Sequence, residues 1–402
     1  MFIFKKIQSL KPILLIIAFM GIVFSICKGI ENTKKVPNNV HNQKDISHEE
    51  SMRAVWVSYL EFNISSEKNT EKAFKDKFSK IIEDSKKHKI NTLIVQVRAF
   101  SDSLYKSNIF PWSHILIGEQ GKDPNFDPLK YMIEESHKNG IKFHAWINPF
   151  RVKFKENPKA LSKNNPYYKF DKDKHFINHS SGICFNPAYE KVRNLIIEGV
   201  KEIVKNYSVN GIHFDDYFYP ENGKDIAYEE HCKENPNNHM SELVWRKNYI
   251  NMFIRQTYSE IKKINPNVIF GISPAGKINN CYKVGADVKR WLSEKGYVDY
   301  LTPQIYWSLN FKVAPFEKIA KNWKNLHKNK NVKLYGGLAL YKVGTNLDLG
   351  TWKCQRNNIL ASESKILKKL GYSGYVLFSH RFLNIPAAKL EMQNLDSDKS
   401  FG

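Results

Sequence analysis

Eight short segments rich in β-branched and aromatic residues recur along the chain after residue 51, and stretches of helical periodicity separate them. Strands that alternate with helices imply right-handed βαβ units and a parallel sheet. Eight such units favour a closed (β/α)₈ TIM barrel, which needs about 250 residues or more. The sequence therefore predicts an α/β barrel with strands at 52–60, 91–99, 142–149, 211–218, 268–275, 299–307, 333–341 and 374–381.

The stretches between the strands contain apolar residues at helical spacing, and two of them stop at a glycine, Gly140 and Gly371. Long insertions follow the third strand (151–187) and the fourth strand (220–240), at the strand ends where a barrel builds its binding face. An open doubly wound sheet would also alternate, but no glycine-rich phosphate turn follows any predicted strand. Helices are expected at 67–88, 128–139, 188–207, 241–264, 286–295, 315–328 and 353–370.

The first thirty residues have the layout of an export signal or membrane anchor. Lys5, Lys6 and Lys11 precede an uncharged apolar run over residues 12–27. Residues 31–51 are polar and fit a linker, residues 52–393 form the predicted domain, and 394–402 are left as a tail. We therefore expect an extracytoplasmic protein at the cell surface, either membrane-anchored or secreted.

Charge gives an indication about partners. The first fifty residues hold seven lysines and four acidic residues, which leaves +19 of the formal net charge of +22 on the rest of the chain. Such a field favours anionic wall polymers over nucleic acid if the protein is exported, although a generally lysine-rich proteome would give the same charge with no partner. The five cysteines form no C-x-x-C pair, so free thiols are expected, with one or two disulfides left open.

Polar and aromatic residues gather at the predicted strand ends. In a barrel these ends ring one mouth, so the residues should converge on a cleft. Flat aromatic side chains suit sugar faces, and amides, arginines and carboxylates suit hydroxyl groups. For each residue alone a structural role is an open alternative. The candidate substrate contacts are Tyr59, Gln96, Arg98, Asp102, His144, Trp146, Asn148, Arg151, His213, Tyr217, Gln304, Tyr306, Trp307 and Tyr341.

The fourth strand ends on two adjacent aspartates in NGIHFDDYFYP. Period-two alternation places Ile212 and Phe214 against the helices and His213 and Asp215 toward the barrel interior. Asp216 follows where the strand gives way to a loop. Two such close carboxyl groups should not both ionise easily, which would leave one acid and one base. Glycoside hydrolysis needs this division, so both aspartates are the candidate catalytic residues.

Other chemistries lack their motifs. The third strand carries His144-Ala145-Trp146 in place of the H-x-H of barrel metal hydrolases, and Ser273 is followed by proline, unlike a G-x-S-x-G nucleophile. We expect neither a metal nor a cofactor.

Several blocks together resemble the glycoside hydrolase-like 10 family, which includes bacterial cell-wall hydrolases. They are MRAVWVSYL, NTLIVQVRAFSDSLY, FDPLKYMIEESHKNGIKFHAWINPFRV, NGIHFDDYFYP, FGISPAG, DYLTPQIYW and GYVLFSHR. The resemblance spans residues 52–381 and implies a barrel that hydrolyses glycosidic bonds, with peptidoglycan strands as the substrate. It also implies that Asp215 and Asp216 occupy the family's acid positions and that its other rim residues match Gln96, Arg98, His144, Asn148, Gln304 and Tyr306.

The chain departs from the family pattern at one place. Residues 275–279 read AGKIN where the family has an aromatic residue and an arginine, so one subsite should be altered, and a non-catalytic glycan-binding protein is the alternative. Two mechanisms stay open. In one, the substrate's own N-acetyl group attacks while Asp215 steadies it and Asp216 donates the proton. In the other, Asp215 acts with a carboxyl group across the bond, such as Asp102 or Glu61.

Overall fold

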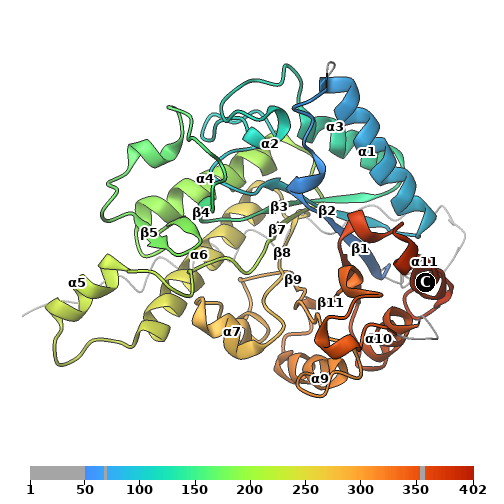
Figure 1. Cartoon of the computed structure of the whole chain (residues 1–402). Helices are drawn as coiled ribbons and strands as arrows, with labels where there is room; N and C mark the ends of the chain where they lie inside the picture. Colours follow the sequence, from blue (N-terminus) through green and yellow to red (C-terminus); the bar gives the residue numbers. More distant parts are fainter. Residues whose placement is uncertain (1–49, 68–69, 354–357) are drawn as a thin grey trace, which may run out of the picture. The chain divides into compact units, whose positions relative to one another are not determined.

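The computed structural model describes residues 50–67, 70–353 and 358–402 (Figure 1). The predicted export segment and linker lie almost entirely outside these residues. None of the helices within the described ranges combines the length and the apolar character that a membrane span requires. Residues 50–402 form one compact unit.

The central sheet is parallel throughout and has the order β10-β9-β8-β7-β3-β2-β1-β12-β11. Its two outermost strands, β10 and β11, are separated in the chain by Tyr335 alone, so they act as one interrupted strand and the sheet closes on itself. The predicted eight-membered barrel is confirmed. The strands are β1 (Met52–Val57), β2 (Thr92–Arg98), β3 (Lys142–Ile147), β7 (Gly211–Phe214), β8 (Ile269–Ile272), β9 (Tyr300–Leu301), β10 (Lys333–Leu334), β11 (Gly336–Leu338) and β12 (Gly374–Phe378).

Helices surround these strands, as Figure 1 shows. Their apolar faces meet the outward side chains of the barrel: Phe214 of β7, for example, stacks on Phe253 with ring centroids 5.6 Å apart. The main helices are α1 (Thr70–Lys87), α3 (Pro128–Lys138), α4 (Glu190–Asn206), α6 (Glu242–Ile264), α9 (Phe316–Leu326), α10 (Ile359–Lys369) and α11 (Lys389–Ser397). Short 3₁₀ helices are η1 (Tyr59–Glu61), η2 (Pro166–Lys169), η3 (Leu340–Lys342), η4 (Asp348–Gly350), η5 (His380–Phe382) and η6 (Pro386–Ala388).

The helix predicted at 286–295 is much shorter than expected. The segment between β8 and β9 instead contains α7 (Ile278–Lys283) and the single turn α8 (Val288–Trp291). The carbonyl of Leu292 accepts hydrogen bonds from the amides of Lys328 and Asn329, at 3.0 and 2.8 Å, in place of a following helical turn. A contact distant in sequence therefore ends the helix.

Both long insertions lie where the sequence predicts them. The first forms a three-stranded antiparallel sheet, in the order β4-β6-β5, from β4 (Arg151–Phe154), β5 (Phe176–His179) and β6 (Gly182–Phe185). The second contains α5 (Ile226–Glu234), and a further short helix, α2 (His114–Ile117), follows β2. The sequence patterns did not predict the small sheet.

A chain of hydrogen bonds fills the barrel interior below the mouth. The Tyr300 hydroxyl group lies 3.0 Å from His144 Nδ1 and 2.9 Å from His213 Nδ1. On its other side His213 Nε2 accepts a hydrogen bond from Trp56 Nε1 at 3.3 Å. Burial holds the pKa of both histidines well below the usual range, so both rings are neutral. Gly271 leaves the room that the Tyr300 ring occupies.

The C-terminal residues belong to the folded domain. The expected boundary at residue 393 falls inside α11, and Phe401 is buried against Tyr375 with ring centroids 6.0 Å apart. The carbonyl of Phe401 also accepts a hydrogen bond from Arg53 Nη1. The last residues therefore pack against β1 and β12 and are not a tail. Cys184, Cys232 and Cys281 are free thiols.

Candidate active site

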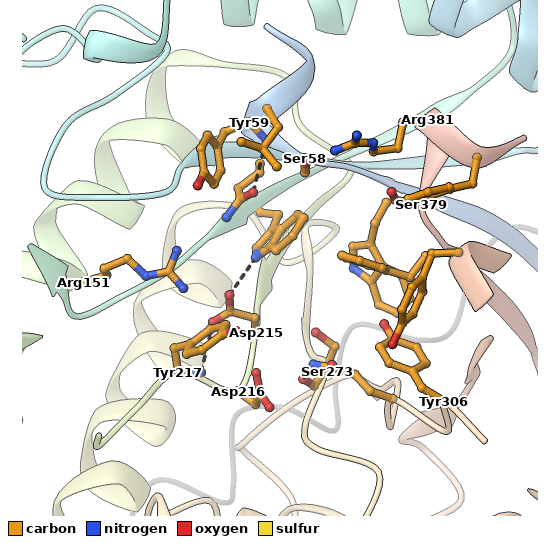
Figure 2. Close-up of a pocket in the computed structure, with 18 of the residues that line it drawn as sticks. Ser58, Tyr59, Arg151, Asp215, Asp216, Tyr217, Ser273, Tyr306, Ser379 and Arg381 are labelled. Carbon is orange, nitrogen blue, oxygen red and sulfur yellow. Dashed lines mark hydrogen bonds between the residues drawn. The ribbon is translucent and has the colours of Figure 1, made fainter. Parts of the chain in front are cut away.

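A cavity of about 350 Å³ opens at the carboxyl ends of the barrel strands (Figure 2). Side chains from the ends of β1, β2, β3, β7, β8 and β12, and from the segments after β9 and β11, line it. The sequence-based candidates that the structure brings together here are Tyr59, Gln96, Trp146, Arg151, Asp215, Asp216, Tyr217, Gln304, Tyr306 and Tyr341.

Asp215 lies at the floor of this cavity, with 2% of its surface exposed. Its Oδ2 accepts hydrogen bonds from Trp146 Nε1, at 3.3 Å, and from the Asn148 side-chain amide. Its Oδ1 accepts from the backbone amide of Tyr217 at 3.1 Å. Because three donors and no acceptor surround this carboxyl group, its environment suits the ionised form.

Asp216 comes directly after the strand and is only partly buried. Its carboxyl group interacts with its own backbone amide and with the side chain of Gln304. Gln304 in turn donates from Nε2 to the carbonyl of Ser273 at 2.9 Å, which fixes the orientation of its amide. Asp216 is therefore the more accessible carboxyl group of the two.

Both aspartates titrate near neutral pH. Burial raises the pKa of Asp215 to about 7, Arg151 opposes this rise, and the charge of Asp216 adds to it. Burial also raises the pKa of Asp216 to about 6, with hydrogen bonds and Arg151 acting against it. Because the two groups interact, the values describe successive proton losses from the pair. Figure 2 shows Arg151 on one side of Asp215, consistent with this influence.

Aromatic rings form much of the cavity wall. Tyr306 packs against Phe378 and Tyr341, with centroids 5.8 Å apart in each pair. Tyr217 is 55% exposed at the rim, and the Arg151 guanidinium lies 4.5 Å from its ring centroid. Rings with exposed faces next to hydrogen-bonding groups are well suited to sugar binding. The candidate list omitted other lining residues, namely Trp56, Ser58, Leu60, Phe154, Ser273, Phe378, Ser379, Arg381 and Phe382.

The strand pattern contained a signal for some of these omissions. Trp56 lies between Val55 and Val57, so alternation places its side chain on the opposite face of the strand from the two valines. Because its indole N–H can donate a hydrogen bond, the face toward the barrel interior was as plausible as the face toward the helices. Phe378 and Arg381 lie at the end of the last predicted strand, which belongs to the same ring of strand ends as the other candidates.

Four candidates support the cavity without lining it. Asn148 links Asp215 to the Gln96 side chain from behind. His144 and His213 belong to the interior hydrogen-bond chain below the mouth. Trp307 packs against Gly276, and Lys277 lies 5.3 Å from its ring centroid. The structure therefore gives these four no direct place against a ligand in this cavity.

Arg98 and Asp102 point elsewhere. A bulge in the pairing of β2 with β3 at Gln96 and Arg98 interrupts the alternation, and Arg98 points outward, over the ring of Phe110 and against α4. Asp102 Oδ2 accepts one hydrogen bond from Gln120 Nε2, at 2.9 Å, and lies 2.8 Å from His114 Nδ1. Neither Arg98 nor Asp102 therefore makes the expected contact in this cavity, because both side chains are buried away from it.

Glu61, the other carboxyl group considered as a partner across the bond, is also absent from the lining. It lies 2.5 Å from His380 Nδ1 in a separate cluster. Neither Asp102 nor Glu61 is therefore placed to act with Asp215 on a ligand in the cavity. Among the described residues, no group of three or more histidine, cysteine or acidic side chains is arranged to hold a metal ion.

A closed (β/α)₈ barrel that carries adjacent carboxyl groups and aromatic walls at its strand ends is the architecture of barrel glycoside hydrolases. The comparison with protein families agrees. The chain belongs to the glycosyl hydrolase-like 10 family, whose model matches residues 51–352.

Two curated relatives carry glycosyl hydrolase names. The chain is 36% identical over 322 residues to glycosyl hydrolase YngK of Bacillus subtilis, covering 74% of this chain and 62% of that protein. It is 29% identical over 436 aligned positions to glycosyl hydrolase DigH of Escherichia coli K12, covering 98% of each. The chain thus spans under two thirds of the length of the Bacillus protein.

Solved structures support the fold. The glycoside hydrolase domain of PgaB (BpsB) from Bordetella bronchiseptica superposes with a TM-score of 0.57 at 13% identity, covering 86% of this chain and 99% of that domain. The α-L-fucosidase isoenzyme 2 from Paenibacillus thiaminolyticus gives 0.54 at 12% identity, covering 86% and 49%. At these identities the likeness concerns the barrel alone.

Proposed function

We propose that the protein is an exported glycoside hydrolase that cleaves glycosidic bonds in cell-wall glycan, in particular the N-acetylated strands of peptidoglycan. The observation that carries the proposal is the lining of the barrel cavity: within the described residues, its carboxyl groups are those of Asp215 and Asp216. The family membership and the relatives' names support a hydrolase. Export rests on the sequence of residues 1–30.

The geometry favours assistance by the substrate. Two adjacent residues that follow one strand cannot flank a glycosidic bond from opposite sides, and Asp102 and Glu61, the carboxyl groups considered as opposite partners, lie outside the cavity. In this proposal Asp216 donates a proton to the glycosidic oxygen while the acetamido oxygen of the substrate bonds to the anomeric carbon and the bond to the leaving sugar breaks. Asp215 accepts the acetamido N–H.

The second half of the reaction regenerates the enzyme. Asp216, now ionised, removes a proton from a water molecule whose oxygen attacks the anomeric carbon. The bond between that carbon and the acetamido oxygen breaks, and the configuration is retained. The donors from Trp146, Asn148 and Tyr217 hold the Asp215 carboxylate in place through both steps.

The decisive experiment is digestion of purified peptidoglycan, intact and stripped of its stem peptides, with products identified by mass. Asp215→Asn and Asp216→Asn should each abolish release of reducing ends, while Asp76→Asn, an exposed change on α1, controls for the loss of one charge. An aryl glycoside of N-acetylglucosamine has a leaving group that needs no proton. Of the two variants, Asp216→Asn should therefore retain turnover on it, and Asp215→Asn should not. Full activity of both variants would show that the pair is structural. Tight glycan binding by the unmodified protein without any turnover would identify a binding protein instead.

A further inference from the structure

A second cavity of about 320 Å³ adjoins the first. The two share Arg151, Phe154, Asp216 and Tyr217 and are nearly equal in volume. Strands β4 and β6, with the turn that joins β5 to β6, form one side of the second cavity, and the segment after β7 forms the other. The cleft therefore continues from the barrel mouth, past the aspartates, to the inserted small sheet.

The two aspartates differ in how they relate to these cavities. Asp215 lines the first cavity, whereas Asp216 lines both. A general acid in glycoside hydrolysis protonates the oxygen that joins two sugars, so it has to stand between the sites that hold them. The sugar whose acetamido group reacts then occupies the first cavity beside Asp215, and the leaving sugar occupies the second.

Positive charge is concentrated in the second cavity. Arg151 and Lys153 line it, and neither has an ion-pair partner within the ranges that the structure describes. The Arg151 guanidinium is held among rings, 4.5 Å from the Tyr217 centroid and 5.5 Å from the Phe154 centroid. The aromatic rings orient this arginine, and its N–H groups form no ion pair with a carboxylate of the described chain. It can therefore bind an anionic group of a ligand.

The other titratable groups of the second cavity leave the positive charge in excess. His179 is neutral, because burial and Arg151 lower its pKa, and its Nε2 lies 3.4 Å from Cys184 Sγ. Burial raises the pKa of the Cys184 thiol to about 12, so it is uncharged as well. Tyr217 and Tyr219 have raised pKa values and stay protonated. The remaining carboxyl groups are those of Asp216, which is protonated when it acts as the acid, and of Glu221, which is exposed at the outer edge.

We propose that the second cavity is the leaving-group subsite and that it selects an acidic sugar, whose ring-borne carboxylate binds to Arg151 and Lys153. This inference rests on the proposed function. Guanidinium groups bind carboxylates through two parallel hydrogen bonds, and ammonium groups bind them as point charges. A neutral sugar leaves both cations without a partner, so the subsite discriminates against it.

The test compares peptide-free wall strands, which carry carboxylates, with the same strands after the carboxylates are converted to methylamides. The unmodified protein should show a higher kcat/KM on the acidic strands by about ten-fold or more, since a hydrogen bond to a charged group is worth at least that factor. Lys153→Gln should reduce this preference several-fold, and Lys153→Arg should restore it. Lys159→Gln, an exposed change on the same insertion that lines neither cavity, should keep the full preference.

The outcomes separate the two proposals. Equal cleavage of acidic and amidated strands, or an unchanged preference in Lys153→Gln, would overturn the acidic subsite and leave the hydrolase proposal standing. No cleavage of either polymer by the unmodified protein would instead contradict the proposed function. Thermal unfolding of each variant confirms that the comparison is made on folded protein.

Discussion

The paired carboxyl groups predict a narrow pH optimum for hydrolysis. Activity needs one proton on the pair, with an acid to protonate the leaving oxygen and a carboxylate to hold the acetamido group. The two values belong to the pair, and the three donors around Asp215 favour the carboxylate there and the proton on Asp216. Below a pH of about 6 both groups hold protons and the carboxylate is missing. Above about 7 both are ionised and the acid is missing. The optimum should therefore lie near pH 6.5.

The size of the effect follows from these two values. With successive pKa values of about 6 and 7, roughly 60% of the molecules carry a single proton at pH 6.5, and about 9% do so at pH 5 or at pH 8. The value of kcat/KM for reducing-end release should fall roughly seven-fold at each of these limits. Measurement from pH 4 to 9 at constant ionic strength gives the profile directly.

Arg151 supplies the perturbation that tests the cause. Its charge lowers the pKa of both Asp215 and Asp216, so Arg151→Met should move both limbs of the profile to higher pH, by roughly one unit. Arg381 lines the opposite side of the same cavity, and Arg381→Met should leave the optimum in place (Figure 2). A profile that is flat from pH 5 to 8, or an optimum that does not move in Arg151→Met, would refute this reasoning.

Three further outcomes concern stability, measured by urea unfolding. The buried pair binds its protons more tightly in the folded state, so the stability that these protons contribute is lost as pH rises from about 4 to about 7. Asp215→Asn removes one of the two groups and should therefore gain about 3–5 kcal/mol over that range relative to the unmodified protein, and a pH-independent difference would contradict it. Tyr300→Phe removes the hydroxyl group between His144 and His213 and should cost about 2–4 kcal/mol; a loss under about 1 would show that water replaces it. In Gly271→Ala the new Cβ would lie 2.0 Å from a Tyr300 ring atom, so a loss of about 2–3 kcal/mol or more is expected, and wild-type stability would show that the ring has room to move.

The barrel was predictable because its pattern is local. Alternating apolar residues and helix stops give each strand and helix in turn, and parallel pairing leaves few ways to assemble eight such units. The same alternation placed Asp215 inside the mouth and Phe214 against α6. The prediction of a helix at 286–295 was wrong because a contact from the loop after α9, which is remote in sequence, ends the helix at Leu292.

The candidate site was only partly predictable, for a related reason. The rule that polar residues at strand ends face the cleft holds only while strict alternation continues, and a single bulge in β2 sends Arg98 to the outer face. Depth along the strand also matters. His144 and His213 point inward as predicted, but they lie below the mouth, where Tyr300 separates them. A single sequence indicates on which face of a strand a side chain lies better than it indicates how far the residue lies from the cavity opening.

The division of the cleft has a practical consequence. The two aspartates follow a barrel strand, whereas one wall of the second cavity belongs to the insertion between β3 and α4. If the second cavity is the leaving-group subsite as proposed, exchanging residues 152–187 between homologues would transfer the preference for the leaving sugar, while Arg151 and the two aspartates would stay unchanged. Natural variation in this one insertion would then change which glycans a single barrel accepts.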